Sequence, residues 1–199
     1  MTVTSEMTRL MNNVRLHAPG ALDDVFRLEL FNALNDFFTD TKVWQEDIDF
    51  DTVVDQRDYP IVENESATMI TLMGVVNSED IPVAAAMQTP GSVSLQTLPS
   101  DVQTLTATVA LTVVDPVDTD EYPYVPEWLL KKYYATIFEG VVGLMMAQPA
   151  KPYTNERMAI YHTRKFRSGI AIARAEVRHQ NLYGGQTWRF PGFAHGSQR

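Results

Sequence analysis

Residues 127–147 read EWLLKKYYATIFEGVVGLMMA, and this stretch decides the expected fold. Its apolar residues cover most of the circumference of a helix, which indicates a helix buried among several neighbours. Pro123 and Pro126 stand just before it and favour a helix start at residue 127. Gly140 and Gly143 leave room for the close approach of a second helix, at a cost in helix propensity of about 1 kcal/mol each. We therefore expect this helix to lie at the centre of the protein.

Three further helices are expected, at about residues 4–17, 21–39 and 155–182. Pro19-Gly20 separates the first two, and Gly184-Gly185 ends the last. The last helix carries an apolar stripe at spacings of three and four, which we expect to face the core. The members of this stripe are Ala159, His162, Phe166, Ile170, Ala173 and Val177. The opposite face, within an arc of about 100°, holds five arginines: Arg157, Arg164, Arg167, Arg174 and Arg178.

The stretch before the central helix has the two-residue period of β-structure. Residues 104–114 alternate Leu, Ala and Val with Thr, which predicts a strand with one buried face. Residues 92–95 are its expected partner, and residues 67–76 are a third strand. Residues 40–66 are rich in acidic residues and are expected to form irregular structure and short strands. The expected fold class is mainly α: a helical bundle of about four helices with an inserted antiparallel β-region, at about residues 52–114, and an extended C-terminal tail.

Composition bounds the function. The chain has 199 residues, of which 45% are hydrophobic and 21% are charged, so it can bury a sizeable core. It has no cysteine, which excludes disulfides, a thiolate nucleophile and cysteine-based metal sites. No apolar run is long enough to span a membrane, and the first residues lack the pattern of a signal peptide. We therefore expect a soluble protein without an export signal and without membrane contact.

The net charge of −9 is unevenly distributed. Residues 1–150 hold 7 Lys/Arg and 23 Asp/Glu, whereas residues 151–199 hold 9 Lys/Arg and 2 Asp/Glu. Such asymmetry suggests that the basic end meets something acidic, whether nucleic acid, another protein or a neighbouring copy. The overall acidity argues against non-specific DNA binding by the whole molecule.

Motifs for catalysis, cofactors and metals are weak or missing in the sequence. No histidine has the i, i+4 partner of a zinc helix, and His162, on the apolar stripe, is expected to be a core or interface residue. Residues 47–51 begin like a calcium loop but continue with Thr52 where that loop needs glycine, so an extended segment is favoured. Glu139 could have a raised pKa among apolar neighbours. Because Lys132 and Thr136 lie beside it on the helix, a solvated or ion-paired role is favoured. We expect no enzyme, no cofactor and no metal.

The C-terminal residues 186–199 have no helical period but contain three bulky aromatic residues, Trp188, Phe190 and Phe193. Such a tail could stack on bases or anchor in a protein groove. Bulky aromatic residues without a period of their own are typical of contact sites and not of a free monomer, so a protein partner is favoured over nucleic acid.

Three stretches together resemble the head-to-tail adaptor, or neck connector, proteins of tailed bacteriophages. The first is HAPGA at 17–21 followed by DFFTDTKVW at 36–44. The second is PEWLL at 126–130, followed by Tyr134 and Glu139-Gly140. The third is QPAKPYTN at 148–155, followed by Tyr161, Phe166 and Gly169-Ile170. The likeness spans about residues 10–180. The central helix has Gly140-Val141-Val142 where family members often have Gly-Ala-Leu, and the tail matches no family motif.

The resemblance implies a virion structural protein that forms a dodecameric ring. Such a ring lies between the portal protein and a nozzle, stopper or tail-tube protein, and genomic DNA passes through its lumen without specific binding. The protein would reside in the neck or tail region of the virion, and in the host cytoplasm during assembly. The resemblance assigns residues 1–185 to an adaptor domain and 186–199 to a docking tail.

Two sets of residues are assigned to this function. Portal or inter-subunit contacts are expected from Trp188, Arg189, Phe190, Phe193 and the five arginines of the last helix. An acidic lumen lining that would repel the DNA backbone is expected from Glu46, Asp47, Asp49, Asp51, Asp55 and Asp58. Three alternatives stay open: a stopper or tail terminator, a peptidoglycan-cleaving enzyme that uses paired carboxylates, and a single-strand nucleic-acid binder.

Overall fold

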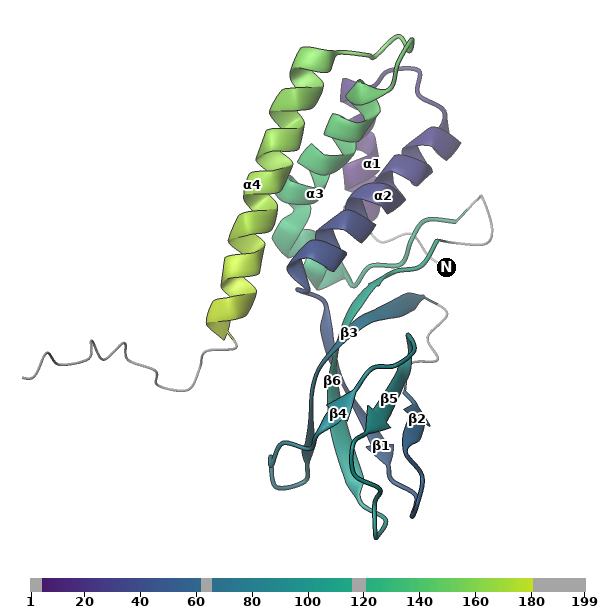
Figure 1. Cartoon of the computed structure of the whole chain (residues 1–199). Coiled ribbons are helices and arrows are strands. Elements are labelled where there is room, and N and C mark those ends of the chain that lie inside the picture. Colours follow the sequence, from purple (N-terminus) through teal and green to yellow (C-terminus); the bar gives the residue numbers. More distant parts are fainter. Residues whose placement is uncertain (1–4, 62–65, 116–120, 181–199) are drawn as a thin grey trace, which may run out of the picture.

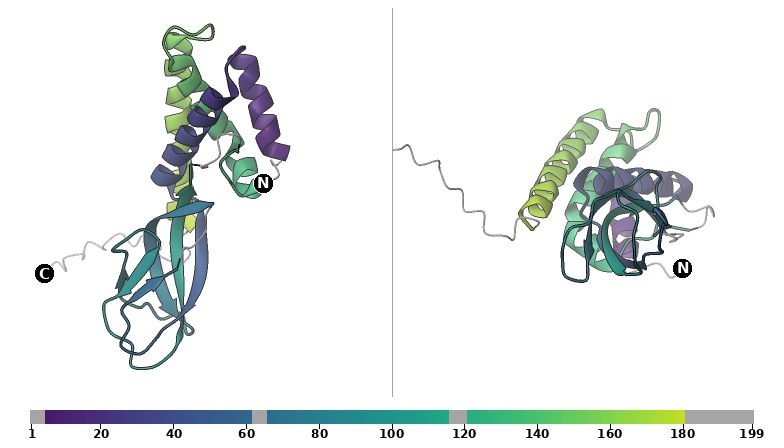
Figure 2. Two further views of the ribbon diagram at one scale, coloured as in Figure 1. Left: turned by 90° about the vertical axis from the view of Figure 1, so that its right-hand side faces the viewer. Right: turned by 60° about the horizontal axis from the view of Figure 1, so that its bottom comes forward.

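The computed structural model describes residues 5–61, 66–115 and 121–180, and it contains a helical part from which a β-part projects (Figure 1). Two helices precede the β-part, α1 (Ser5–His17) and α2 (Asp23–Thr41). Two helices follow it, α3 (Glu127–Ala147) and α4 (Glu156–Gln180). Helix α3 packs against the other three helices and therefore has the central place that its apolar circumference predicts. Figure 2 shows that the β-part extends away from one end of the helices.

In the described ranges, six strands form two small antiparallel sheets. The first sheet has the order β1-β6-β3, from β1 (Gln45–Asp51), β6 (Thr104–Val113) and β3 (Ala67–Asn77). The second has the order β2-β5-β4, from β2 (Asp58–Pro60), β5 (Ser92–Leu95) and β4 (Ala85–Ala86). Strand β3 shifts its register against β6 twice, between Met69 and Thr71 and between Leu72 and Gly74.

The expected mainly α fold class is wrong. The described residues are 46% helical and 23% strand, and they form a mixed α/β fold. The β-part was underestimated because the acidic stretch before residue 52 forms β1, a seven-residue strand paired with β6 along its whole length. Asp47, Asp49 and Asp51 leave on one side, while Ile48 and Phe50 pack against the hydrophobic core on the other. The β-part therefore begins at Gln45, and not at about residue 52.

Strand β5 also differs from its expected pairing. Residues 92–95 were expected beside 104–113, but they pair with β2 and β4 in the second sheet. Val93 and Leu95 are buried in the same core as Leu105 and Val109 of β6. The two segments thus meet through side chains across two sheets, and not through a backbone ladder.

The helices themselves lie close to the expected positions, and their buried faces follow the sequence period. In α2, Phe26, Leu30, Ala33 and Phe37 are buried as expected, whereas Leu22 lies before the helix and is exposed. In α4, five members of the apolar stripe are buried, and Val177 is partly buried and packed against the core. The tail at 186–199 lies outside the described residues.

Glycines in α3 and α4 allow these two helices to approach closely. A β-carbon on Gly140 would lie 2.8 Å from the ring of Phe166, and one on Gly143 would lie 3.1 Å from Oγ1 of Thr163. From the other side, Gly169 of α4 lies against Thr136 of α3. The room that Gly140 and Gly143 were expected to provide is therefore filled by α4.

We predict that Gly140→Ala destabilises the protein although alanine is the better helix former. The gain in propensity is about 1 kcal/mol, but the methyl group must displace a buried phenylalanine ring, so we expect a net loss of about 1–2 kcal/mol in the free energy of unfolding. Urea denaturation measures it. Gly74→Ala is the matched control, since nothing lies within 4 Å of its β-carbon. Equal effects at the two positions would refute the packing argument.

Candidate interaction surfaces

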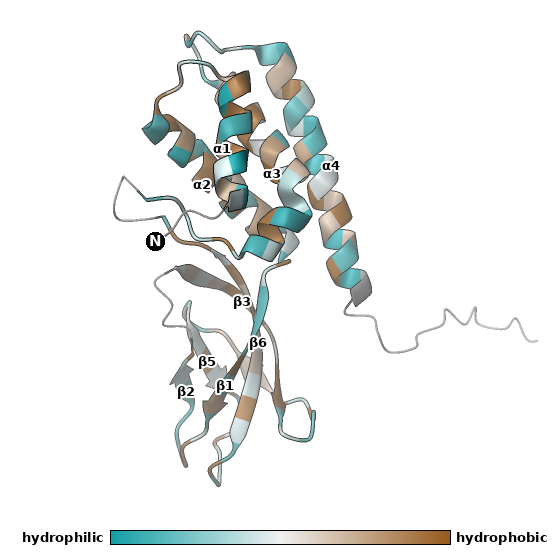
Figure 3. Ribbon diagram, turned by 180° about the vertical axis from the view of Figure 1, so that it is seen from behind, coloured by the Kyte–Doolittle hydropathy of each residue, from teal (hydrophilic) through white to brown (hydrophobic). Residues whose placement is uncertain are grey.

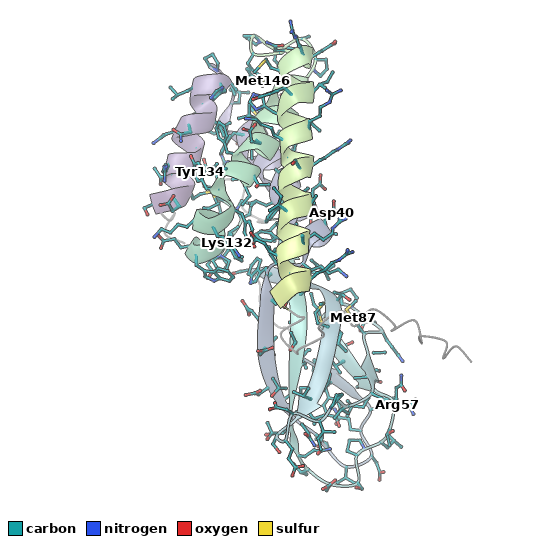
Figure 4. The ribbon with its side chains drawn as sticks, turned by 90° about the vertical axis from the view of Figure 1, so that its left-hand side faces the viewer. Asp40, Arg57, Met87, Lys132, Tyr134 and Met146 are labelled. Carbon is teal, nitrogen blue, oxygen red and sulfur yellow. The ribbon has the colours of Figure 1, made fainter. Side chains whose placement is uncertain are left out.

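The outward side of α4 carries the five arginines that the sequence places there, and all of them are exposed. Arg174 is bound to α2: its Nε donates to the carbonyl oxygen of Asp40 at 3.0 Å, and its Nη2 lies 3.3 Å from the Asp40 carboxylate. Arg157, Arg164, Arg167 and Arg178 form no ion pair with any residue in the described ranges. Figure 4 looks onto this side of α4, with Asp40 beside the helix.

Apolar and small residues share this outward side with the arginines. Ile160 is 55% exposed and Ile172 is 61% exposed, and Tyr161 is also exposed. When α4 is drawn at about 100° per residue, Ser168 lies between Ile172 and the arginines, whereas Ala171 and Ala175 lie among the arginines. Figure 3 shows hydrophilic and hydrophobic residues mixed along α4. Aliphatic side chains beside arginines are typical of protein interfaces.

The first sheet presents a regular row of carboxylates. Asp47, Asp49 and Asp51 are exposed on the same side of β1. Each accepts a hydrogen bond from the threonine directly opposite on β6: Thr108 to Asp47 at 2.6 Å, Thr106 to Asp49 at 2.7 Å, and Thr104 to Asp51 at 2.7 Å. These bonds fix one oxygen of each carboxylate and leave the row facing outward. The extended segment that was favoured over a calcium loop is confirmed.

The outer side of the first sheet continues this row onto β3. Thr108 is opposite Gly74 and Thr106 is opposite Val76, so acidic, hydroxyl and small or apolar side chains follow one another across three strands. Gly74 is exposed with open space above it. We call this surface the open sheet face, and it comprises Asp47, Asp49, Asp51, Thr104, Thr106, Thr108, Gly74 and Val76.

The other three residues of the expected lumen lining are exposed at separate places. Glu46 accepts a hydrogen bond from Nε1 of Trp44 at 2.9 Å. Asp55 lies in the loop after β1 with a positive φ of 62°, and Asp58 begins β2 and accepts a hydrogen bond from Ser94. The six carboxylates therefore divide into a row of three and three dispersed groups.

The β-part is strongly acidic as a whole. Within 45–61 and 66–115, there are ten Asp or Glu residues and a single basic residue, Arg57. At the end far from the helices, four aliphatic side chains are exposed, a feature that we did not predict from the sequence: Val53, Val54, Leu98 and Val102. The two loops that carry them are joined by backbone hydrogen bonds from Thr52 to Gln103 and from Asp55 to Pro99. No periodicity marks these residues, since they belong to two loops.

Glu139 is ion-paired, as expected, but not with its neighbours on α3. Its Oε1 lies 3.0 Å from Nζ of Lys165, and its Oε2 lies 2.5 Å from Nδ1 of His162, both on α4. Lys132, the neighbour on the helix wheel, instead binds Glu176 at 2.9 Å and holds the pKa of that carboxyl below its ordinary value. His162 is buried as expected, and its Nε2 has no hydrogen-bond partner among the described residues.

A groove of about 410 Å³ lies between α2, α3 and α4. Its floor includes Gly140 and Phe166, and its rim includes Asp36, Asp40 and Arg167. Burial, and then the negative charge of Asp40, raise the pKa of Asp36 above its ordinary value. The rim of the groove therefore holds two carboxylates that repel each other, beside the middle of α4.

Chemical groups that would mark other functions are few. Over 5–61, 66–115 and 121–180, no three His, Asp or Glu side chains converge as metal ligands, and no helix is long and apolar enough to cross a membrane. Trp188, Arg189, Phe190 and Phe193, the expected contacts of the tail, lie outside the described ranges. No protein-family model matches the chain, and no curated protein matches it.

We predict that Asp36→Asn stabilises the protein at neutral pH. The raised pKa means that the charged form of Asp36 costs folding free energy above that pKa, and that the cost disappears as the pH falls through it. Because Asp36 is partly exposed, we expect the thermal midpoint at pH 7 to rise by at most about 1 °C. The gain should vanish near pH 3, as measured by thermal scans at both values. A constant gain across the pH range would contradict this cause.

Proposed function

We propose that the chain is a head-to-tail adaptor of a tailed bacteriophage. In this role it assembles as a dodecameric ring between the portal protein and a nozzle, stopper or tail-tube protein, in the neck of the virion. The genome passes through its lumen without specific binding. The resemblance of three motifs supports this assignment, and their order along 17–44, 126–140 and 148–170 follows the order of helices in the structure.

The observation that carries the proposal is the separation of opposite charges onto different surfaces of one chain. The β-part is almost purely acidic, whereas the outward side of α4 presents arginines that the described residues leave largely unpaired. Concentrated like charge destabilises an isolated chain through self-repulsion. Both surfaces gain when one copy meets a different part of the next, which is the kind of contact that closes into a ring.

Other features of the described residues fit a protein whose function is assembly. The four exposed aliphatic residues at the end of the β-part offer a second contact surface, suited to a partner above or below the ring. The acidic residues of the β-part would repel a DNA backbone wherever they line a channel.

We expect electron microscopy to show annular particles with a central opening, formed by the full chain alone or on purified portal protein. Antibodies against the chain should label virions at the junction of head and tail. Labelling along the tail or at its end would reject the adaptor and favour a tail component. Absence of the chain from purified virions would reject the whole class.

We also predict that removal of residues 186–199 leaves a folded subunit that docks poorly. The segment contains Trp188, Phe190 and Phe193 and no acidic residue, a composition that suits anchoring in a protein groove. Circular dichroism should show unchanged helix content, and co-sedimentation with portal protein should fall. The matched control is Gln186→Ala in the full chain, which keeps the aromatic residues and Arg189. Normal portal binding by the truncated chain would contradict the docking role.

A further inference from the structure

The outward side of α4 has an arginine-rich part and an apolar part. The arginine-rich part lies toward α2. Arg174 contacts Asp40 of α2, and Arg167 lines the groove between α2, α3 and α4. Ala171 and Ala175 lie among the arginines, and the exposed Ile172 lies on the far side, with Ser168 between it and the arginines. The buried side of the same helix is already occupied, since it packs on α3 and α2.

The open sheet face consists of three rows of side chains, one from each strand of the first sheet. The carboxylates of β1 form an acidic row, and the threonines of β6 form a middle row of short side chains. Gly74 and Val76 of β3 form a row of small and apolar residues. Met73 beside them is 41% exposed. Because Gly74 has nothing within 4 Å of its β-carbon position, a helix could pack closely at this point.

The two surfaces also match in length. Asp47 to Asp51 spans four residues of a strand, about 14 Å. Arg157 to Arg167 spans ten residues of a helix, about 15 Å. Acidic against basic and apolar against apolar can both be satisfied for one direction of the helix across the strands. The surfaces lie on different parts of the chain, which favours contact between copies.

We propose that α4 of one copy packs with its outward side on the open sheet face of the next copy. This assignment rests on the proposed function in taking the chain to assemble with copies of itself. Arg157, Arg164 and Arg167 then face the carboxylates of β1, and Ile172 covers Gly74 and Met73. The contact is heterologous, because one copy uses a helix and its neighbour uses a sheet. Nucleic acid would match the arginines but not Ile172, and the net charge of −9 opposes it.

A charge swap tests the contact. The variant R164E/R167E makes α4 acidic, and the variant D47K/D49K makes the sheet face basic. Each alone should associate with itself at least about tenfold more weakly than the original chain in sedimentation velocity. An equimolar mixture should recover assembly, because every helix then meets a sheet face of opposite charge in an alternating ring. The exposed pair E79K/D80K is the matched control and should leave assembly unchanged.

Cross-linking tests the register without altering charge. The natural chain has no cysteine, so S168C and M73C each supply a single thiol. A mixture of the two should form disulfide-linked heterodimers, whereas S168C with S78C should not. Gly74→Trp, which the open space should allow to fold, should block both assembly and the cross-link.

The contrary outcomes separate a failure of this interface from a failure of the adaptor role. Rings that form equally well from both charge variants would overturn this interface and leave the adaptor role standing. Loss of double-stranded DNA binding by R164E/R167E with unchanged self-association would make α4 a nucleic-acid surface and would overturn the proposal. A natural chain that stays monomeric at millimolar concentration would also overturn it. The adaptor role is judged separately, by antibody labelling of virions.

Discussion

The rest of the structure depends on how Trp44 joins the helices to the sheets. Its indole is buried, packs edge-on against Phe38 at the end of α2 with ring centroids 5.4 Å apart, and donates a hydrogen bond to Glu46 in β1. Its carbonyl oxygen accepts a hydrogen bond from the backbone of Leu111 in β6 at 2.8 Å. Trp44 lies between the end of α2 and the start of β1, and it contacts α2, β1 and β6. Both parts share one hydrophobic core, so the open sheet face is held in a definite orientation relative to α4.

The sequence predicted α2 and α4 well because each has apolar residues at helical spacing. Phe26, Leu30 and Phe37 in α2, and Phe166 and Ile170 in α4, are separated by three, four or multiples of these spacings, and burial follows. The arginines of α4 could be placed outward for the same reason. The β-part was harder, because β1 alternates Ile48 and Phe50 with aspartates, and a dense acidic run suggests a loop before it suggests a strand. The pairing of β5 depends on contacts distant in sequence, which local patterns do not contain.

The proposed interface shows the same limit. The arginines and the aspartates could each be found by their charge, but the threonines that orient the aspartates become visible only when the register of β1 on β6 is known. Gly74 is informative for a similar reason. In the sequence it is a glycine inside a strand, whereas in the structure it marks open space on an exposed sheet. The pairing of Glu139 with Lys165 and His162 likewise required the packing of α3 on α4.

Both edges of the first sheet bear on how a chain of this kind avoids misassembly at high concentration. Strand β3 is interrupted by two register shifts, and β1 carries an acidic side chain at every second position. Irregular and charged edge strands resist the backbone-to-backbone addition that produces open-ended fibrils. At high concentration these edges therefore oppose polymerisation through backbone pairing. Closed, finite particles are then favoured over aggregates.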